Sequence, residues 1–173
     1  MNSAVGIHIF RFVMLLLLQG LILKRISAGW MGFVYFDVLL YPLFIILLPL
    51  RTPRSLVMIS AFLLGLGVDL FYGTIGLHAA ASVFTAYLRA FILSQLEPRE
   101  GFNVDFSPTK AQLGAPWFFR YASIMLGIHL FAYFSIDAFS PVFFADIVVK
   151  TLYSFVSSMF FISIIVLIFN PKQ

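Results

Sequence analysis

The chain contains no cysteine, which excludes a disulfide bond, a thiolate metal site and a cysteine nucleophile. Charge is also scarce, because only 10% of the 173 residues are Asp, Glu, Lys or Arg, whereas soluble domains carry about 25%. Apolar residues instead make up 62% of the chain and give a mean hydropathy of +1.04. A soluble fold of this size could not bury so much apolar surface. This composition excludes a cytosolic enzyme domain and an ordinary nucleic-acid-binding module.

Sequence motifs of catalysis are missing as well. The chain has no G-x-S-x-G, no H-E-x-x-H, no P-loop and no G-x-G-x-x-G in a loop. We therefore expect a protein that is not an enzyme, with no catalytic residue, no metal and no cofactor. An intramembrane enzyme would need a nucleophile and a base paired at depth, and His129 has no carboxylate or second histidine near it in the sequence. The expected role of His129 is a hydrogen bond to another helix.

Long apolar stretches predict an all-α, polytopic membrane protein, because a membrane-spanning helix needs about 20 mostly apolar residues. The six expected helices cover residues 5–23, 33–50, 55–71, 77–96, 117–136 and 141–169. Residues 1–173 are expected to form a single transmembrane domain. A signal peptide is the competing interpretation of the first stretch. Lys24 and Arg25, which follow it directly, and the lack of a small-x-small cleavage site argue against that interpretation.

Basic residues predict the orientation. Six spans place both termini on one side, where eight basic residues lie against three on the other, so the positive-inside rule predicts cytoplasmic termini. The eight are Arg11, Arg51, Arg54, Arg89, Arg99, Lys110, Arg120 and Lys172, and the three are Lys24, Arg25 and Lys150. The net charge of +4 is thus attributed to orientation and not to a nucleic-acid partner. The polar stretch 97–115 is interpreted as a charged surface loop, with a cluster of its carboxylates as the alternative.

Asp69 is the first candidate for a structural or interaction role, because ionisable groups inside a membrane are costly. It continues a row of small residues at four-residue steps, Ala61 and Gly65, which Gly73 extends. Residues four apart share a helix face, so Asp69 is predicted to face protein and not lipid. Three roles stay open: a solvated or capping carboxylate at the outer helix end, a contact in a partner interface or polar cluster, and an ion or substrate relay.

His78 begins a similar row on the next helix, which continues with Ser82, Ala86 and Ala90. The two rows predict close packing of the third and fourth expected helices. His78 itself is interpreted as an interfacial hydrogen-bonding residue, with a ligand or a pH switch as alternatives. Arg89 either extends its side chain to the cytoplasmic head groups or pairs with Asp69 across the two helices. On the sixth expected helix, Thr151, Ser154 and Ser158 form a polar row that predicts helix-packing contacts.

One stretch of the chain matches a family pattern. Residues 64–79, LGLGVDLFYGTIGLHA, followed by Ala86-Tyr87-Leu88-Arg89, resemble the bacterial rod shape-determining MreD family. That family shows Gly-x-x-x-Asp, a turn containing glycine, then Gly-Leu-x-Ala and Ala-Tyr-Leu. Arg11-Phe12, Tyr41-Pro42 and Leu48-Pro49 fit the family too. The resemblance covers most of residues 10–100, and the last two spans match only in hydropathy.

The resemblance implies a function and a fold. It implies a non-enzymatic component of the cell-elongation complex in the bacterial cytoplasmic (inner) membrane, which maintains cell shape and supports lateral peptidoglycan synthesis. It implies MreC as the direct partner, with MreB filaments and the RodA–transpeptidase synthase in the wider complex. The implied fold is similar to the six-helix membrane substrate-binding subunits of energy-coupling-factor transporters. Asp69, Gly73, Gly76 and His78 are carried over as motif positions only.

Such a transporter subunit, for a vitamin or another small molecule, is the alternative function. It should enclose a pocket to which several helices contribute polar groups.

Overall fold

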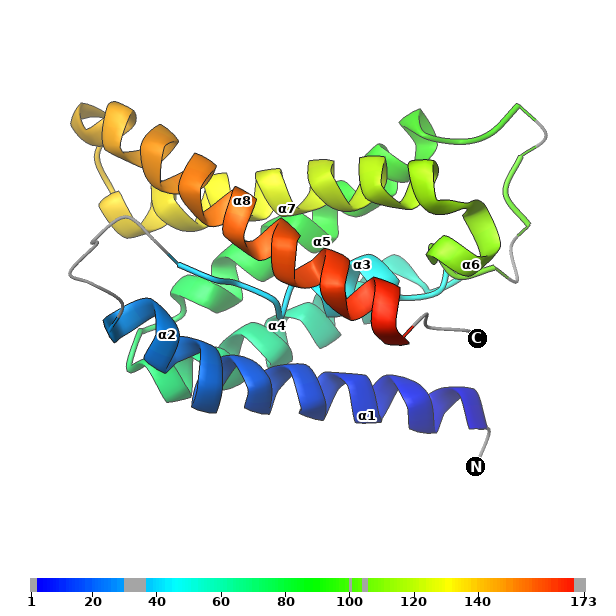
Figure 1. Ribbon diagram of the computed structural model, residues 1–173, viewed down its shortest axis with the longest axis horizontal. Helices are drawn as coiled ribbons and strands as arrows, with labels where there is room; N and C mark the ends of the chain where they lie inside the picture. The colour runs from blue at the N-terminus through cyan, green and yellow to red at the C-terminus, as the bar shows by residue number, and fades with distance from the viewer. Residues whose placement is uncertain (1–2, 30–36, 100, 104–105, 170–173) are drawn as a thin grey trace.

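The computed structural model describes residues 3–29, 37–99, 101–103 and 106–169, and every regular element among them is a helix (Figure 1). Five helices are long and apolar enough to cross a membrane, which confirms an all-helical protein of membrane type. They are the continuous helix of α1 (Ser3–Leu17), η1 (Leu18–Leu23) and α2 (Lys24–Gly29), then α4 (Arg54–Tyr72), α5 (Leu77–Gln95), α7 (Ala115–Ala138), and η2 (Pro141–Phe143) with α8 (Phe144–Phe169). The short helices α3 (Leu43–Leu47) and α6 (Lys110–Leu113) complete the described helices.

The prediction that residues 33–50 form the second helix is wrong. Its beginning lies outside the described residues, residues 37–40 are extended, and only α3 is helical. Two prolines explain the difference. Pro42 has no N–H and would clash with the preceding turn, so the helix begins only after it. Leu48 takes an extended conformation, with φ −62° and ψ 142°, because the following Pro49 disfavours a helical one.

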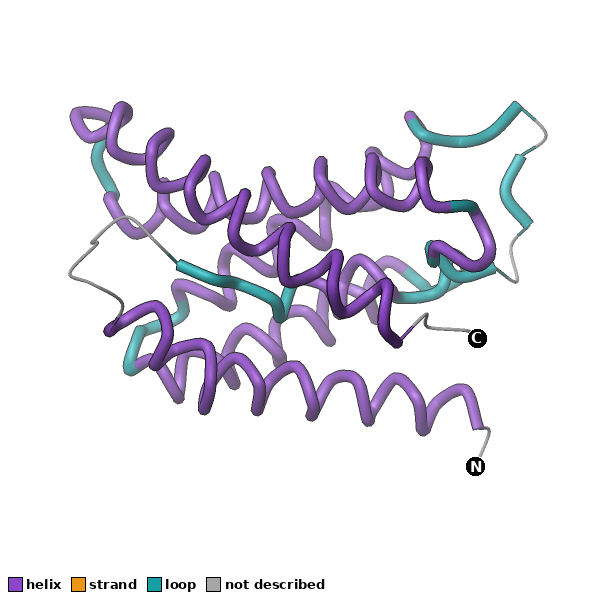
Figure 2. Tube along the Cα trace, viewed as in Figure 1, coloured by secondary structure: helices purple, strands orange, loops and turns teal. Residues whose placement is uncertain are grey.

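This interrupted segment runs through the centre of the molecule, between α8 and the helix that begins with α1 (Figure 2). Residues 38–48 are all buried, and Tyr41 and Ile45 are completely inaccessible. The beginning of α1 and the end of α8 lie at the same end of the bundle (Figure 1). Residues 37–50 thus run lengthwise through the bundle, in the position of the expected second helix (Figure 2).

Side chains satisfy the backbone of the extended part. The Asp37 and Leu39 N–H groups donate to the hydroxyl oxygens of Ser154 at 3.1 Å and Ser158 at 2.9 Å. On the other side, the Gln19 side chain accepts from the Leu40 N–H at 2.8 Å and donates to the Val38 carbonyl at 3.0 Å. Successive residues of an extended chain point their groups to opposite sides, so alternate residues bond to α8 and to η1. Away from water, non-helical backbone is tolerated only when protein groups satisfy it in this way.

The polar row on α8 therefore has a different role from the predicted one. Ser154 and Ser158 bond to an extended segment instead of a neighbouring helix, and the Thr151 hydroxyl has no partner in the described part of the chain.

Gln19→Leu is expected to destabilise the fold by about 2–3 kcal/mol, because it leaves the Leu40 N–H and the Val38 carbonyl without this partner in a dry interior. Ser60→Ala is the matched control, because the Ser60 hydroxyl bonds only to the Val57 carbonyl of its own helix. The measurement is the fraction of monodisperse protein left after heating in mild detergent. Equal losses in the two variants would contradict the role given to Gln19.

Candidate functional site

The turn between α4 and α5, residues 73–76, requires glycine at both of its ends. Gly73 ends α4 with φ 72°, and Gly76 precedes α5 with φ 77°. Side chains make such positive φ values unfavourable, so these two motif glycines are explained by backbone geometry. The Gly73 N–H also donates to the Asp69 carbonyl at 2.8 Å, which closes the end of α4.

Asp69 is buried, with 2% of its surface exposed, and its carboxylate binds the beginning of α5. It accepts from the backbone N–H groups of His78 and Ala79, both at 3.0 Å, and from the Thr74 hydroxyl. These two N–H groups have no partner within their own helix, and Gly76, at the capping position, has no side chain to offer. Asp69 thus caps α5 from the preceding helix, and its negative charge lies at the positive end of the α5 dipole.

The capping role was one of those left open by the sequence, and the prediction that Asp69 faces protein is confirmed. Close packing of α4 and α5 along the small-residue rows is confirmed too. Ala61 and Ser82 are inaccessible, and a Cβ at Gly65 would lie 2.5 Å from the Ala79 Cα.

His78 is completely buried and forms a side-chain hydrogen bond, as expected, but its two ring nitrogens have different surroundings. Nδ1 lies 2.9 Å from the Asp69 carboxylate and donates to it. Nε2 has no hydrogen-bond partner in the described part of the chain. The rings of Tyr41, Tyr72 and Tyr133 surround the imidazole, with centroids 5.7, 4.7 and 4.9 Å away. His78 and Asp69 thus form a hydrogen-bonded pair, buried next to the α4–α5 turn.

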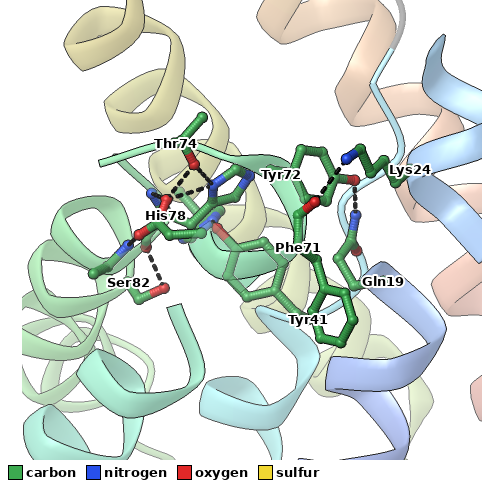
Figure 3. A network of polar contacts seen from close by, with 11 residues as sticks. Gln19, Lys24, Tyr41, Phe71, Tyr72, Thr74, His78 and Ser82 are labelled. Carbon is green, nitrogen blue, oxygen red and sulfur yellow. Dashed lines mark hydrogen bonds and ion pairs between the residues drawn. The ribbon is translucent and has the colours of Figure 1, made fainter. Parts of the chain in front are cut away.

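A second group of contacts joins this turn to the first helix (Figure 3). Gln19 donates to the Tyr72 hydroxyl at 2.8 Å, and the Lys24 ammonium donates to the Phe71 carbonyl at 2.6 Å (Figure 3). Lys24 supplies a cation to the last turn of α4, where helix carbonyls lack partners. Sequence reasoning used Lys24 only to end a helix and to orient the chain.

His129 bonds across the centre of the bundle, as predicted. Its Nε2 lies 2.7 Å from the Tyr41 hydroxyl and its Nδ1 lies 2.9 Å from the Thr85 hydroxyl oxygen. Thr85 donates its single proton to the Ala81 carbonyl, so Nδ1 must donate to Thr85. In the tautomer with its proton on Nδ1, the imidazole accepts the Tyr41 proton at Nε2.

Arg89 lies at the other end of α5 and has no contact with Asp69. Its Nε donates to the Tyr121 hydroxyl at 3.1 Å, and its Nη2 donates to the Leu48 carbonyl. The hypothesis of an Asp69–Arg89 ion pair is therefore wrong, because antiparallel packing places the two groups towards opposite ends of the hairpin. The side chain is only 4% exposed, so most of it is enclosed by protein groups.

No family model, curated protein or solved structure matches the chain.

At the α4–α5 turn, the polar groups around Asp69 form hydrogen bonds with one another, so the bonded groups are not free to bind a ligand. The Asp69 carboxylate accepts four hydrogen bonds from the turn and from α5. Within the described residues, no three His, Asp or Glu side chains gather where they could hold a metal ion. Two of the carboxylates in the expected loop cluster, Glu100 and Asp105, lie outside the described residues.

Sequence reasoning missed Gln19, Tyr41 and Tyr72 as parts of this site. Gln19 carried a usable signal, since it is a single amide within a strongly apolar helix. Nothing in the spacing of the tyrosines indicated that they surround a histidine.

Proposed function

We propose that this chain is a non-enzymatic scaffold of the bacterial rod, or cell-elongation, complex, which binds MreC and supports lateral peptidoglycan synthesis. The basis is the resemblance of residues 64–79 to the MreD family, together with what these residues do in the fold. Asp69, Gly73, Gly76 and His78 build and close one helix hairpin. Residues that hold two helices together in this way have a structural role, which requires no bound substrate.

One observation favours a scaffold most directly: the polar side chains at the centre of the bundle are inaccessible to solvent. Tyr41, His78 and His129 each have 0% exposed surface, so even a water-sized sphere does not touch them. Residues 38–48 are all buried as well, so the chain itself occupies the centre of the bundle. This arrangement favours a scaffold over the transporter substrate-binding subunit that was the alternative.

The wider setting is part of the same proposal. The chain would lie in the bacterial cytoplasmic (inner) membrane, crossed six times, with MreB filaments and the RodA–transpeptidase synthase as further members of the complex. Both chain ends would face the cytoplasm, together with Arg54, Arg89 and Arg120.

The topology gives a direct prediction. A reporter that works only in the cytoplasm is expected to be active when fused after Gln173, whereas a periplasmic reporter there is expected to be silent. A periplasmic reporter inserted in the α4–α5 turn, after Thr74, should give the opposite result. Periplasmic activity after Gln173 would contradict the proposed orientation.

The functional test is copurification and depletion. In mild detergent the tagged chain is expected to copurify MreC in a stable ratio, and its depletion is expected to turn rod-shaped cells round. Re-expression of the chain should restore rods. Purification without MreC, or with a bound vitamin and no change in cell shape, would contradict the scaffold and favour the transporter subunit.

A further inference from the structure

A cleft of about 450 Å³ opens at the end of the α4–α5 hairpin opposite to Asp69. This volume lies in the range of roughly 300–1,000 Å³ that is usual for small-molecule sites. The first turn of α4, the last turns of α5 and the chain around Thr52 line it. Its polar lining comprises Thr52, Arg54, Arg89, Ser94 and Glu97.

Arg89 brings an uncompensated charge to this cleft. Its guanidinium is a cation, yet among the described residues its Nε and Nη2 bond only to neutral oxygens, those of Tyr121, Leu48 and Pro49. Nη1 has no hydrogen-bond partner among the described residues, and no described carboxylate pairs with the guanidinium. A cation that is 96% buried is unfavourable without a counter-ion, so the site is suited to an external anion.

Arg54 adds a second positive charge on the rim. It is the first residue of α4, and its guanidinium lies 5.7 Å from the centre of the Tyr87 ring. The beginning of a 19-residue helix also offers unpaired N–H groups to an anion. Among the described lining residues, two arginines against the carboxylate of Glu97 give a net charge of +1, which matches one phosphodiester.

The remaining lining is apolar and lies beside the two arginines. Val57 on α4 and Ala86, Ala90 and Leu93 on α5 line the same cleft, and the two alanines leave room beside the helix. A phospholipid suits this combination, because its phosphodiester would bond to the arginines and an acyl chain would pack on the apolar part. A free phosphate ion would use only the polar half.

We propose that this cleft binds an acidic phospholipid such as phosphatidylglycerol, with its phosphodiester on Arg89 Nη1 and Arg54 and an acyl chain beside Ala90. The site is independent of the role in the rod complex, because it needs only a membrane-embedded chain.

Native mass spectrometry of the purified full chain, titrated with phosphatidylglycerol in detergent, tests the proposal. Arg54→Gln and Ala90→Phe are expected to lower the affinity for the first bound lipid about tenfold, the loss typical of one charge-assisted hydrogen bond or of a filled site. Neither change removes the bonds of Arg89 to Leu48 and Tyr121, so the fold is retained. Arg120→Gln removes an exposed charge outside the cleft, near the beginning of α7, and should leave the affinity unchanged.

Two further probes identify the ligand. Inorganic phosphate should displace the lipid only at high concentration, and phosphatidylethanolamine, which has no net charge, should bind at least tenfold more weakly than phosphatidylglycerol. Equal affinity for the two lipids, or equal losses in Arg54→Gln and Arg120→Gln, would overturn the proposal. Tight binding of inorganic phosphate without binding of phosphatidylglycerol would overturn it as well.

Discussion

Asp69→Leu is expected to destabilise the folded protein by about 4 kcal/mol and to remove most of its folded yield. The change leaves four donors without an acceptor: the N–H groups of His78 and Ala79, the His78 ring and the Thr74 hydroxyl. Each unsatisfied donor in a dry interior costs about 1–3 kcal/mol, and partial relaxation of the turn recovers some of that loss. The measurement is the unfolding temperature in mild detergent, together with cell shape after depletion of the native chain.

Asp69→Asn should lower the free energy of unfolding by less, about 1–2 kcal/mol, because one acceptor oxygen remains. The matched control is Asp146→Leu, which removes an exposed carboxylate in the first turn of α8 and should change stability by less than about 0.5 kcal/mol. If asparagine fails as badly as leucine, the negative charge at the start of α5 is what matters. If all three variants behave alike and support rods, the capping role is contradicted.

Gly65→Leu is expected to prevent the α4–α5 hairpin from closing. Even a single added Cβ would lie 2.5 Å from the Ala79 Cα and 2.6 Å from the His78 carbonyl oxygen. Both atoms belong to the backbone of α5, which cannot move aside as a flexible side chain could. Gly65→Ala should therefore cost about 2–3 kcal/mol, and the leucine variant should yield almost no monodisperse protein.

Gly127→Ala is the control for this prediction. A Cβ there would lie 3.9 Å from the Phe155 ring, an ordinary contact, and alanine favours a helix over glycine by about 0.5–1 kcal/mol. The expected result is unchanged or slightly higher stability. A Gly65→Leu protein as stable as Gly127→Ala would show that the two helices do not pack at Gly65.

The sequence predicted the long helices and the helix faces that meet. Five of the six expected spans agree with helices of the structure, because a lipid-exposed stretch of about 20 apolar residues satisfies its backbone by forming a helix. The four-residue spacing of Ala61, Gly65 and Asp69 correctly placed Asp69 against another helix, since small residues permit close approach. For His129, a lone polar side chain at depth correctly indicated a bond to another helix, which is the bond to Thr85 of α5.

The remaining features depend on contacts that spacing does not encode. We predicted a helix over residues 33–50 from hydropathy alone, although Pro42 and Pro49 argue against a continuous helix there. The partners of Asp69 and Arg89 depend on the rotation and depth of each helix, and these follow from packing. That Ser154 and Ser158 bond to residues 37 and 39 could not be predicted, because an extended membrane segment leaves no hydropathy signal that differs from a helix.

The extended segment also sets the order in which the protein can mature. Its amide groups at residues 37 and 39 find their partners 117 and 119 positions later in the chain, on the last helix. A ribosome therefore releases this stretch long before α8 exists. Until then, the stretch needs water, lipid head groups or the insertion machinery as a temporary partner. The centre of the bundle can therefore close only after α8 has been made, and a ribosome that stalls before α8 leaves behind a protein whose centre is still open.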